Sequence, residues 1–334
     1  MKTKGIFRCV VVAGVFCGMF LWGCQKAQTG PTAAESSGMV KIALIPTIGE
    51  TASYKILTQA RRTTKWQGPV PDKATFEDNF NEERVEMSIT QQIQEVDPSG
   101  EIVAKITIDG LKCLYSNKSM ASVDFDSSRQ ADANNPLMKL IGKTYRIEFN
   151  PSNSITAMSD FPPVIKSFND GTPSGQAGAD IMLYEVIKER HSLFQLPPQG
   201  QEMLKPGGKW TKIRTFPFGK MGLKSYEKIY TLTNVRETNS RKIAVIDMKA
   251  IPTSEVEPKY VSLQAEVGVP KMFDTNDSYT GSGEIDLKTG RIENYHENFQ
   301  TSWFVALPSK QNDTSEPVVL NMLATRVYSI ERIK

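Results

Sequence analysis

The side chains that most often perform catalysis or bind metals are sparse in this sequence. Its two histidines, His191 and His296, are far apart, and neither belongs to an H-E-x-x-H motif. Beyond Cys24, Cys113 is the one remaining cysteine, so a zinc site built from histidine and cysteine is disfavoured. His191 lies near the apolar side of a predicted helix, which favours a buried, hydrogen-bonded ring over a ligand or base. For Cys113 a buried, inert thiol is favoured over a redox role.

Motifs for nucleotide binding and nucleophilic catalysis are also missing. The sequence has no G-x-S-x-G, no Walker loop and no G-x-G-x-x-G. Gly281-Ser282-Gly283 leads into a predicted strand, so we interpret it as a bulge or turn before that strand. With 37 acidic residues, two carboxylates could lie close enough for glycoside hydrolysis, but the sequence does not indicate which two. We therefore predict no catalytic, cofactor-binding or metal-binding residue, no cofactor, and a protein that is not an enzyme.

Aromatic and basic residues offer two further candidate features. The three tryptophans of the predicted globular part either pack in the core at the ends of a curved sheet or line a binding site; they are Trp66, Trp210 and Trp303. Beside Trp66, Arg61-Arg62 and Lys65 form a small basic cluster, which is typical of a solvated strand face.

The N-terminal residues have the pattern of an export signal. Lys2, Lys4 and Arg8 precede the apolar run 10–22, which is shorter than the ~20 residues of a membrane-spanning helix. The run ends in Leu21-Trp22-Gly23-Cys24, which resembles the lipobox of bacterial lipoproteins, although a small residue is usual where Trp22 stands. This resemblance implies that Cys24 is lipidated and becomes the anchored N-terminus. An ordinary cleaved signal or an uncleaved anchor is the alternative.

Removal of residues 1–23 would change both the charge and the expected location. The net charge of +3 falls to zero, because the signal carries three positive and no negative charges. No electrostatic footprint for nucleic acid remains, so we predict no nucleic-acid partner. Residues 24–39, rich in Ser, Ala, Thr and Gly, are predicted to be a flexible tether. By the lipoprotein resemblance, Gln25 favours the periplasmic face of the outer membrane over retention at the inner membrane.

The first half of the globular part shows strand periodicity. Val85, Met87, Ile89 and Ile93 alternate with polar residues, which indicates an antiparallel strand with one wet face. After the turn 97–100, apolar residues return on one face of a second strand, and a further strand and turn follow at 145–153.

The second half repeats this layout. Residues 243–248 match 103–108, and Ile285 and Leu287 take the places of Ile147 and Phe149 before the turn 288–290. We interpret this as a diverged internal duplication, the alternative being that two antiparallel meanders simply look alike. Between the halves, Asp180 is a candidate N-cap for a helix that carries Leu183, Val186, Ile187 and Phe194.

These patterns predict a mainly β fold, with two similar antiparallel β units, which could curve as half-barrels, joined by a short α-helical connection. The expected division is 1–23 signal peptide, 24–39 tether, 40–196 first β unit with its C-terminal helix, and 197–334 second β unit. The long connections 111–140 and 252–280 are expected to be polar loops.

Residues 50–334 as a whole resemble an uncharacterised family of bacterial envelope lipoproteins, a domain of unknown function. Three stretches carry the resemblance: Asn135-Pro136-Leu137 leading to Ile141-Gly142-Lys143, then Gly207-Gly208-Lys209-Trp210, then 281–290. The resemblance implies a lipoprotein body and supplies no catalytic residue.

Three functions are compatible with these expectations. The first is a non-enzymatic, membrane-anchored envelope lipoprotein that binds an apolar or amphipathic ligand in the concavity of its sheet. The second is a structural or assembly lipoprotein that docks protein partners through its loops. The third is a hydrolase of envelope polymers, which would need a cleft with two suitably spaced carboxylates.

Overall fold

The computed structural model describes residues 38–69, 77–118, 122–168, 171–218, 222–238, 240–262, 274–306 and 316–333. The chain divides into two units, 1–34 and 35–334, and every described residue belongs to the second. The predicted signal peptide, Cys24 and all of the tether before Gly38 lie outside the described residues.

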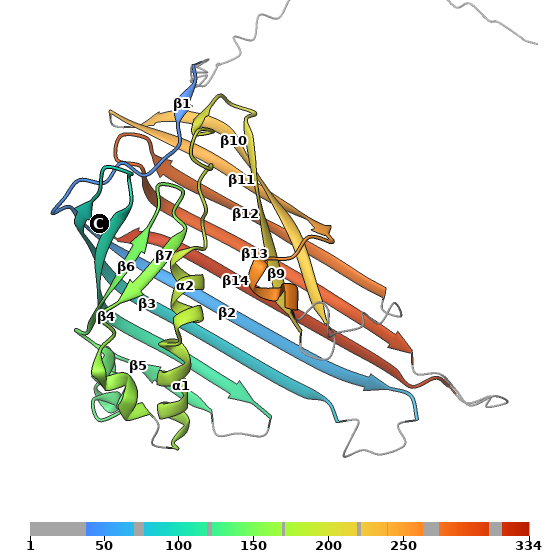
Figure 1. The fold of residues 1–334 in the computed structure, drawn as a ribbon. Helices are drawn as coiled ribbons and strands as arrows, with labels where there is room; N and C mark the ends of the chain where they lie inside the picture. The colour runs from blue at the N-terminus through green and yellow to red at the C-terminus, as the bar shows by residue number, and fades with distance from the viewer. Residues whose placement is uncertain are drawn as a thin grey trace, which may run out of the picture. The chain divides into compact units, whose positions relative to one another are not determined.

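Long antiparallel strands make up most of the described unit (Figure 1). The strands are β1 (Val40–Lys41), β2 (Thr51–Gln67), β3 (Asn79–Val96), β4 (Ile102–Asn117), β5 (Val123–Asp126), β6 (Thr144–Phe149), β7 (Ile155–Ser159), β8 (Met203–Leu204), β9 (Lys209–Pro217), β10 (Leu223–Thr238), β11 (Arg241–Thr253), β12 (Asp274–Asp286), β13 (Arg291–Ala306) and β14 (Val319–Ile333). The helices are α1 (Pro173–Ile181) and α2 (Tyr184–His191), with short 3-10 helices at Gln130–Asp132, Pro136–Leu140, Pro163–Phe168 and Pro258–Tyr260. No helix of the described residues has the length and apolar character to cross a bilayer.

One open sheet contains both halves of the sequence. Its strand order is β7-β6-β4-β3-β2-β14-β13-β12-β11-β10-β9, with β5 paired beside β4, while β1 and β8 form a separate pair. The last strand, β14, pairs with the first long strand, β2, along almost its whole length. The predicted mainly β fold with a short helical connection is confirmed, and the two halves are continuous through this pairing.

The matched positions of the two halves occupy equivalent places in the sheet. Ala104 of β4 lies opposite Ile147 of β6, and Ala244 of β11 lies opposite Ile285 of β12. All four side chains are buried. A duplication would produce this shared register, and the duplication itself stays a prediction.

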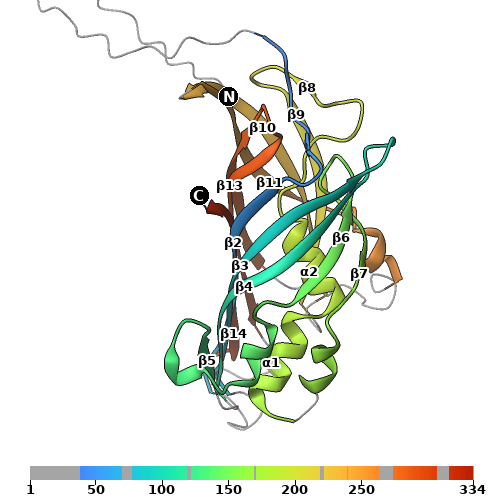
Figure 2. The same cartoon turned by 90° about the vertical axis from the view of Figure 1, so that its left-hand side faces the viewer.

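The sheet has one buried and one exposed face. Along β13, buried residues alternate with exposed ones, as expected for strands with side chains on alternate sides. Both α-helices lie on one side of the sheet (Figure 2), which we call the inner face. Glu189 of α2 is joined to it by a hydrogen bond of 2.7 Å from the Tyr328 hydroxyl of β14.

The helical connection begins earlier than the sequence predicts. Thr172 is the N-cap of α1, where its Oγ1 accepts a hydrogen bond of 3.0 Å from the Gly175 amide. Asp180 lies in the last turn of α1, so its prediction as an N-cap was wrong. The residues Pro173–Ala179 are mostly small and carry no apolar periodicity, so the sequence pattern did not reveal α1. Phe194, predicted to be helical, lies beyond the end of α2.

Two loop predictions also need correction. Gly281 and Gly283 lie inside β12, not before a strand. A Cβ at Gly283 would lie 3.1 Å from the Phe194 ring, so glycine lets that ring pack directly on the strand. The connections predicted at 111–140 and 252–280 are shorter, because β4 extends to Asn117 and β12 begins at Asp274.

Candidate ligand-binding site

An apolar cavity lies between the inner face and the segment 44–50, which leads into β2. The space inside it that a water molecule can enter is about 80 Å³, and the wider empty volume of about 770 Å³ includes open solvent at its mouth. Most of its wall is aliphatic, and we name it the isoleucine cavity. Its isoleucines include Ile56, Ile89, Ile93, Ile102, Ile147, Ile292 and Ile330.

The segment 44–50 is held over the sheet by backbone contacts. The Ile45 amide donates to the Thr289 carbonyl at 3.2 Å, and the Gly49 amide donates to the Ile93 carbonyl at 2.9 Å. Gly290 has a φ of 67°, and a Cβ there would overlap the Ala43 carbonyl oxygen. The turn predicted at 288–290 is therefore present, and its glycine allows the chain to lie across it.

The C-terminal end of α2 contributes two polar side chains to the cavity wall, Arg190 and His191. Arg190 is only 1% exposed, and its Nη1 donates to the Ile181 carbonyl at 3.3 Å. Its Nε and Nη2 have no hydrogen-bond partner among the described residues. Burial lowers the pKa of Arg190, but an arginine stays protonated in proteins. The cavity therefore has a buried positive charge in its wall.

His191 is buried beside Arg190 and is hydrogen-bonded, as its sequence context predicts. Its Nε2 lies 2.7 Å from the Tyr145 hydroxyl. Burial, and then the charge of Arg190, lower the pKa of His191 to about 3. The imidazole is neutral at physiological pH, so it does not add to the positive charge of Arg190.

A second arginine of the cavity wall is already neutralised. Arg291 forms an ion pair with Glu50, and both side chains are half-buried. Arg291 also donates to the Thr51 carbonyl at 3.4 Å. Arg291 therefore has a carboxylate partner, whereas Arg190 has none among the described residues.

The inner face of the second half is filled by aromatic rings. Phe194 stacks on Tyr295 with centroids 4.4 Å apart, and Trp210 stacks on Tyr230 at 5.1 Å. Trp210 and Trp303 are buried in this core, so of the two roles expected for them, core packing is the one observed. Trp66 is half-buried and is not part of the isoleucine cavity.

A buried ion pair lies among these rings. Lys228 Nζ is 2.6 Å from Glu297 Oε2, and the hydroxyls of Tyr279 and Tyr295 donate to the same carboxylate at 2.7 and 2.5 Å. Burial by itself lowers the pKa of Lys228, but the Glu297 carboxylate outweighs this, and the net shift is upward. Lys228 is therefore protonated, and both side chains of the pair have hydrogen-bond partners.

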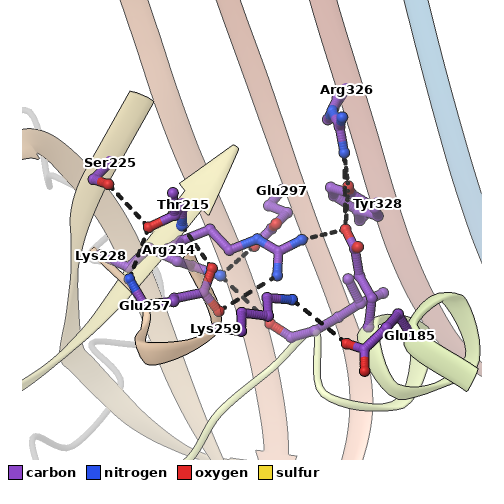
Figure 3. Close-up of polar contacts among 12 residues, drawn as sticks. Glu185, Arg214, Thr215, Ser225, Lys228, Glu257, Lys259, Glu297, Arg326 and Tyr328 are labelled. Carbon is purple, nitrogen blue, oxygen red and sulfur yellow. Dashed lines mark hydrogen bonds and ion pairs between the residues drawn. The ribbon is translucent and has the colours of Figure 1, made fainter. Parts of the chain in front are cut away.

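A second polar group, which includes Arg214, Arg326 and Tyr328 of the sheet (Figure 3), surrounds Glu189 of α2. Glu189 forms an ion pair with Arg214 of β9, lies 3.9 Å from Arg326 of β14, and accepts the Tyr328 hydrogen bond. Burial by itself raises the pKa of Glu189, but Arg214 and Arg326 reverse this and hold it below its usual range. These contacts fix α2, and with it the adjacent Arg190, against the inner face.

The remaining predicted candidates lie away from the isoleucine cavity. His296 is exposed within β13, and Arg61, Arg62 and Lys65 are exposed on β2. Cys113 is buried, and burial raises the pKa of its thiol to about 12. Among the described residues, no group of three or more His, Cys, Asp or Glu is arranged to hold a metal ion.

Sequence reasoning missed Arg190. It stands in Lys188-Glu189-Arg190-His191 at the end of a helix, where basic residues commonly face solvent and interact with the helix dipole. The charge pattern of this stretch does not distinguish a buried arginine from an exposed one. Its inward position follows from the packing of α2 on a sheet assembled from distant segments.

No family model and no curated protein match the sequence. A solved structure titled "Lipid-protein interactions in lipovitellin" aligns with 86% of this chain at 12% identity and a TM-score of 0.40, and this chain spans about a quarter of it, 25%. An outer membrane channel from Pseudomonas putida F1 aligns with 92% of this chain and 100% of its own, at 6% identity and a TM-score of 0.20. OpdL of Pseudomonas aeruginosa aligns with 85% of this chain and 99% of its own, at 8% identity and a TM-score of 0.19. Scores this low assign neither a fold family nor a function.

Proposed function

We propose that this chain is a non-enzymatic, membrane-anchored envelope lipoprotein that binds an apolar or amphipathic ligand in the isoleucine cavity. The observation that carries the proposal is the cavity itself, a largely aliphatic space beneath a segment of chain on the inner face. Apolar surface left in a cavity loses favourable contacts, which a ligand of matching shape would restore.

The side chains that cover the inner face differ between the two halves of the sheet, and this difference supports ligand binding near the first half. In the second half, the inner face is covered by large aromatic side chains such as Phe216 and Phe299, which stack at 4.5 Å. In the first half, the corresponding wall consists largely of isoleucines, and the cavity remains between them and the segment 44–50. Ligand binding is therefore assigned to the first half together with the adjoining ends of β13 and β14, which supply Arg291, Ile292 and Ile330 to the same wall.

The membrane anchor in this proposal is the lipid on Cys24. Two or more acyl chains would hold the protein stably, since each buried CH₂ contributes ~0.8 kcal/mol. A Cys24→Ser variant expressed in bacteria is expected to move from the membrane fraction to the soluble fraction and to lose incorporation of labelled fatty acid. Unchanged membrane retention of this variant would contradict the anchor.

The ligand is tested by native mass spectrometry and lipid extraction of the mature chain purified from a bacterial envelope. We expect a bound apolar molecule that is lost on denaturation. Ala52 lines the cavity, so Ala52→Trp should fill it and abolish co-purification. Lys55 lies on the opposite face of the same strand, and Lys55→Trp is the matched control that should keep the ligand.

Two results would argue against ligand binding. One is a mass without ligand for the unmodified chain together with no binding of added lipid. The other is equal ligand retention in Ala52→Trp and Lys55→Trp when both variants are folded by circular dichroism. Either result would favour the docking of protein partners through the loops, which crosslinking in the envelope would then identify.

A further inference from the structure

Arg190 is a buried cation with two free hydrogen-bond donors. Its side chain is almost fully removed from solvent, and neither Nε nor Nη2 has a partner among the described residues. A guanidinium buried without an anion is unfavourable, so such groups are normally paired. Arg190 belongs to the wall of the isoleucine cavity, and its free donor atoms are enclosed there, so a ligand reaches them by displacing neighbouring side chains.

The acidic groups around Arg190 are engaged elsewhere. Glu189 is held by Arg214, Arg326 and Tyr328 of the sheet. Glu83 accepts a hydrogen bond of 3.2 Å from the Tyr115 hydroxyl, and burial raises the pKa of this carboxyl group. Arg190 forms no ion pair with a described residue, and Glu83 and Glu189 stabilise its charge only from beyond ion-pair distance.

We propose that Arg190 binds the carboxylate of a long-chain fatty acid whose alkyl chain lies against the isoleucines. This inference rests on the proposed function and specifies its ligand class. It assigns to Arg190 the head group and to residues such as Ile56, Ile89 and Ile147 the alkyl chain.

The free donors of Arg190 match a carboxylate better than a larger anion. Nε and Nη2 lie on the same edge of the planar guanidinium, so together they offer two parallel N–H groups to the two oxygens of one carboxylate. Nη1 is occupied by the Ile181 carbonyl at 3.3 Å. His191 is neutral, so a dianionic phosphate monoester would bring one charge more than Arg190 can balance.

The aliphatic wall selects the rest of the molecule. Branched side chains from β2, β3, β4 and β6 face the cavity, and they provide apolar contacts of the kind an alkyl chain makes. The second cation of the wall, Arg291, has Glu50 as its partner and is therefore the weaker candidate for the head group.

The experiment compares two ligands that differ in charge at one end. Hexadecanoate and hexadecanol, both radiolabelled and delivered from cyclodextrin, are bound to the delipidated mature chain. We expect hexadecanoate to bind about tenfold more tightly or better, the preference given by one charge-assisted bidentate contact. Arg190→Met should lose this preference, whereas Arg146→Met, at an exposed side chain of β6 outside the cavity wall, is the control that should keep it.

The possible results separate this inference from the proposed function. Equal binding of acid and alcohol, or a preference retained in Arg190→Met or lost in Arg146→Met, would overturn the role of Arg190 while leaving apolar ligand binding intact. Failure of both ligands to bind the unmodified chain, with no lipid co-purifying, would overturn both proposals.

A second readout uses only the unmodified chain, in case Arg190→Met does not fold. Hexadecanoate labelled at its carboxyl carbon is titrated by NMR while bound. Beside a guanidinium the carboxyl group should remain ionised to a lower pH than that of the same acid in vesicles of neutral phospholipid. A bound carboxyl group that titrates at the same pH as in vesicles, or at a higher pH, would refute the contact.

Discussion

The Lys228–Glu297 pair offers a direct test of the buried charges of the second half. Glu297→Gln keeps the size of the side chain and removes its charge. Lys228 is 5% exposed and Glu297 is 2% exposed, so the change would leave a lysine ammonium in the core without its anion. The hydroxyls of Tyr279 and Tyr295 would also lose a charged acceptor.

The expected cost follows from this burial. Removing one partner of a buried, hydrogen-bonded ion pair typically costs about 3–5 kcal/mol. Lys242 and Glu237 form a pair at 3.2 Å with side chains 59% and 68% exposed, so Glu237→Gln is a matched control. For a pair this exposed, the expected cost is below about 1 kcal/mol.

The assay is equilibrium unfolding in urea, followed by circular dichroism at neutral pH. A double-mutant cycle of Lys228→Met and Glu297→Gln should show a coupling of about 2 kcal/mol or more, because the second change costs less once the lysine is gone. A coupling near zero, or equal costs for Glu297→Gln and Glu237→Gln, would refute a desolvated ion pair at this position.

Three further predictions concern the cavity and the first half. The pKa of His191 is about 3 when folded and about 6.5 when unfolded, so the unfolded chain binds the proton first and stability falls as the pH drops below 6.5. In acid denaturation series, the free energy of unfolding of His191→Gln should fall with pH less steeply than that of the unmodified chain, by up to about 1.4 kcal/mol per pH unit. Parallel pH profiles of the two proteins would contradict this. Gly290→Ala should cost about 1–3 kcal/mol in urea unfolding and speed amide exchange at Ile45, since it strains a φ of 67° and collides with Ala43; an unchanged exchange rate would contradict the role of this turn. The Cys113 thiol, with a pKa raised to about 12, should react with Ellman's reagent only as the protein unfolds, and fast labelling of the native protein would show that it is exposed.

Much of the sheet could be predicted because its periodicity is local. The strand after the turn 97–100 is predicted to have one apolar face, and the four residues of that face, Ile102, Ala104, Ile106 and Ile108, are all buried. The turn at 97–100 is present, with Gly100 at a φ of 87°. Alternation along a strand depends on which face is covered and not on which strand pairs with it, so the sequence carries this signal residue by residue.

The long-range pairing could not be predicted in the same way. The contact between β2 and β14 joins residues from the two ends of the described chain, and no local pattern in either strand specifies its partner. The same limit applies to Arg190, whose burial depends on where α2 packs. The cavity is therefore a product of tertiary structure, formed where the chain after β1 crosses a sheet assembled from both halves.

The contrast between the two halves supports reading Arg190 as part of a site. In the second half, each of Lys228, Arg214 and Arg326 has a carboxylate within 4.0 Å, and aromatic rings fill the surrounding space. In the first half, a guanidinium of similar burial has no such partner and borders an aliphatic cavity. An arginine with a purely structural role would be expected to have a carboxylate partner, as Lys228, Arg214 and Arg326 do in the same fold. The coincidence of an unpaired cation and an unfilled apolar space is explained by one amphipathic ligand that supplies both the anion and the alkyl chain.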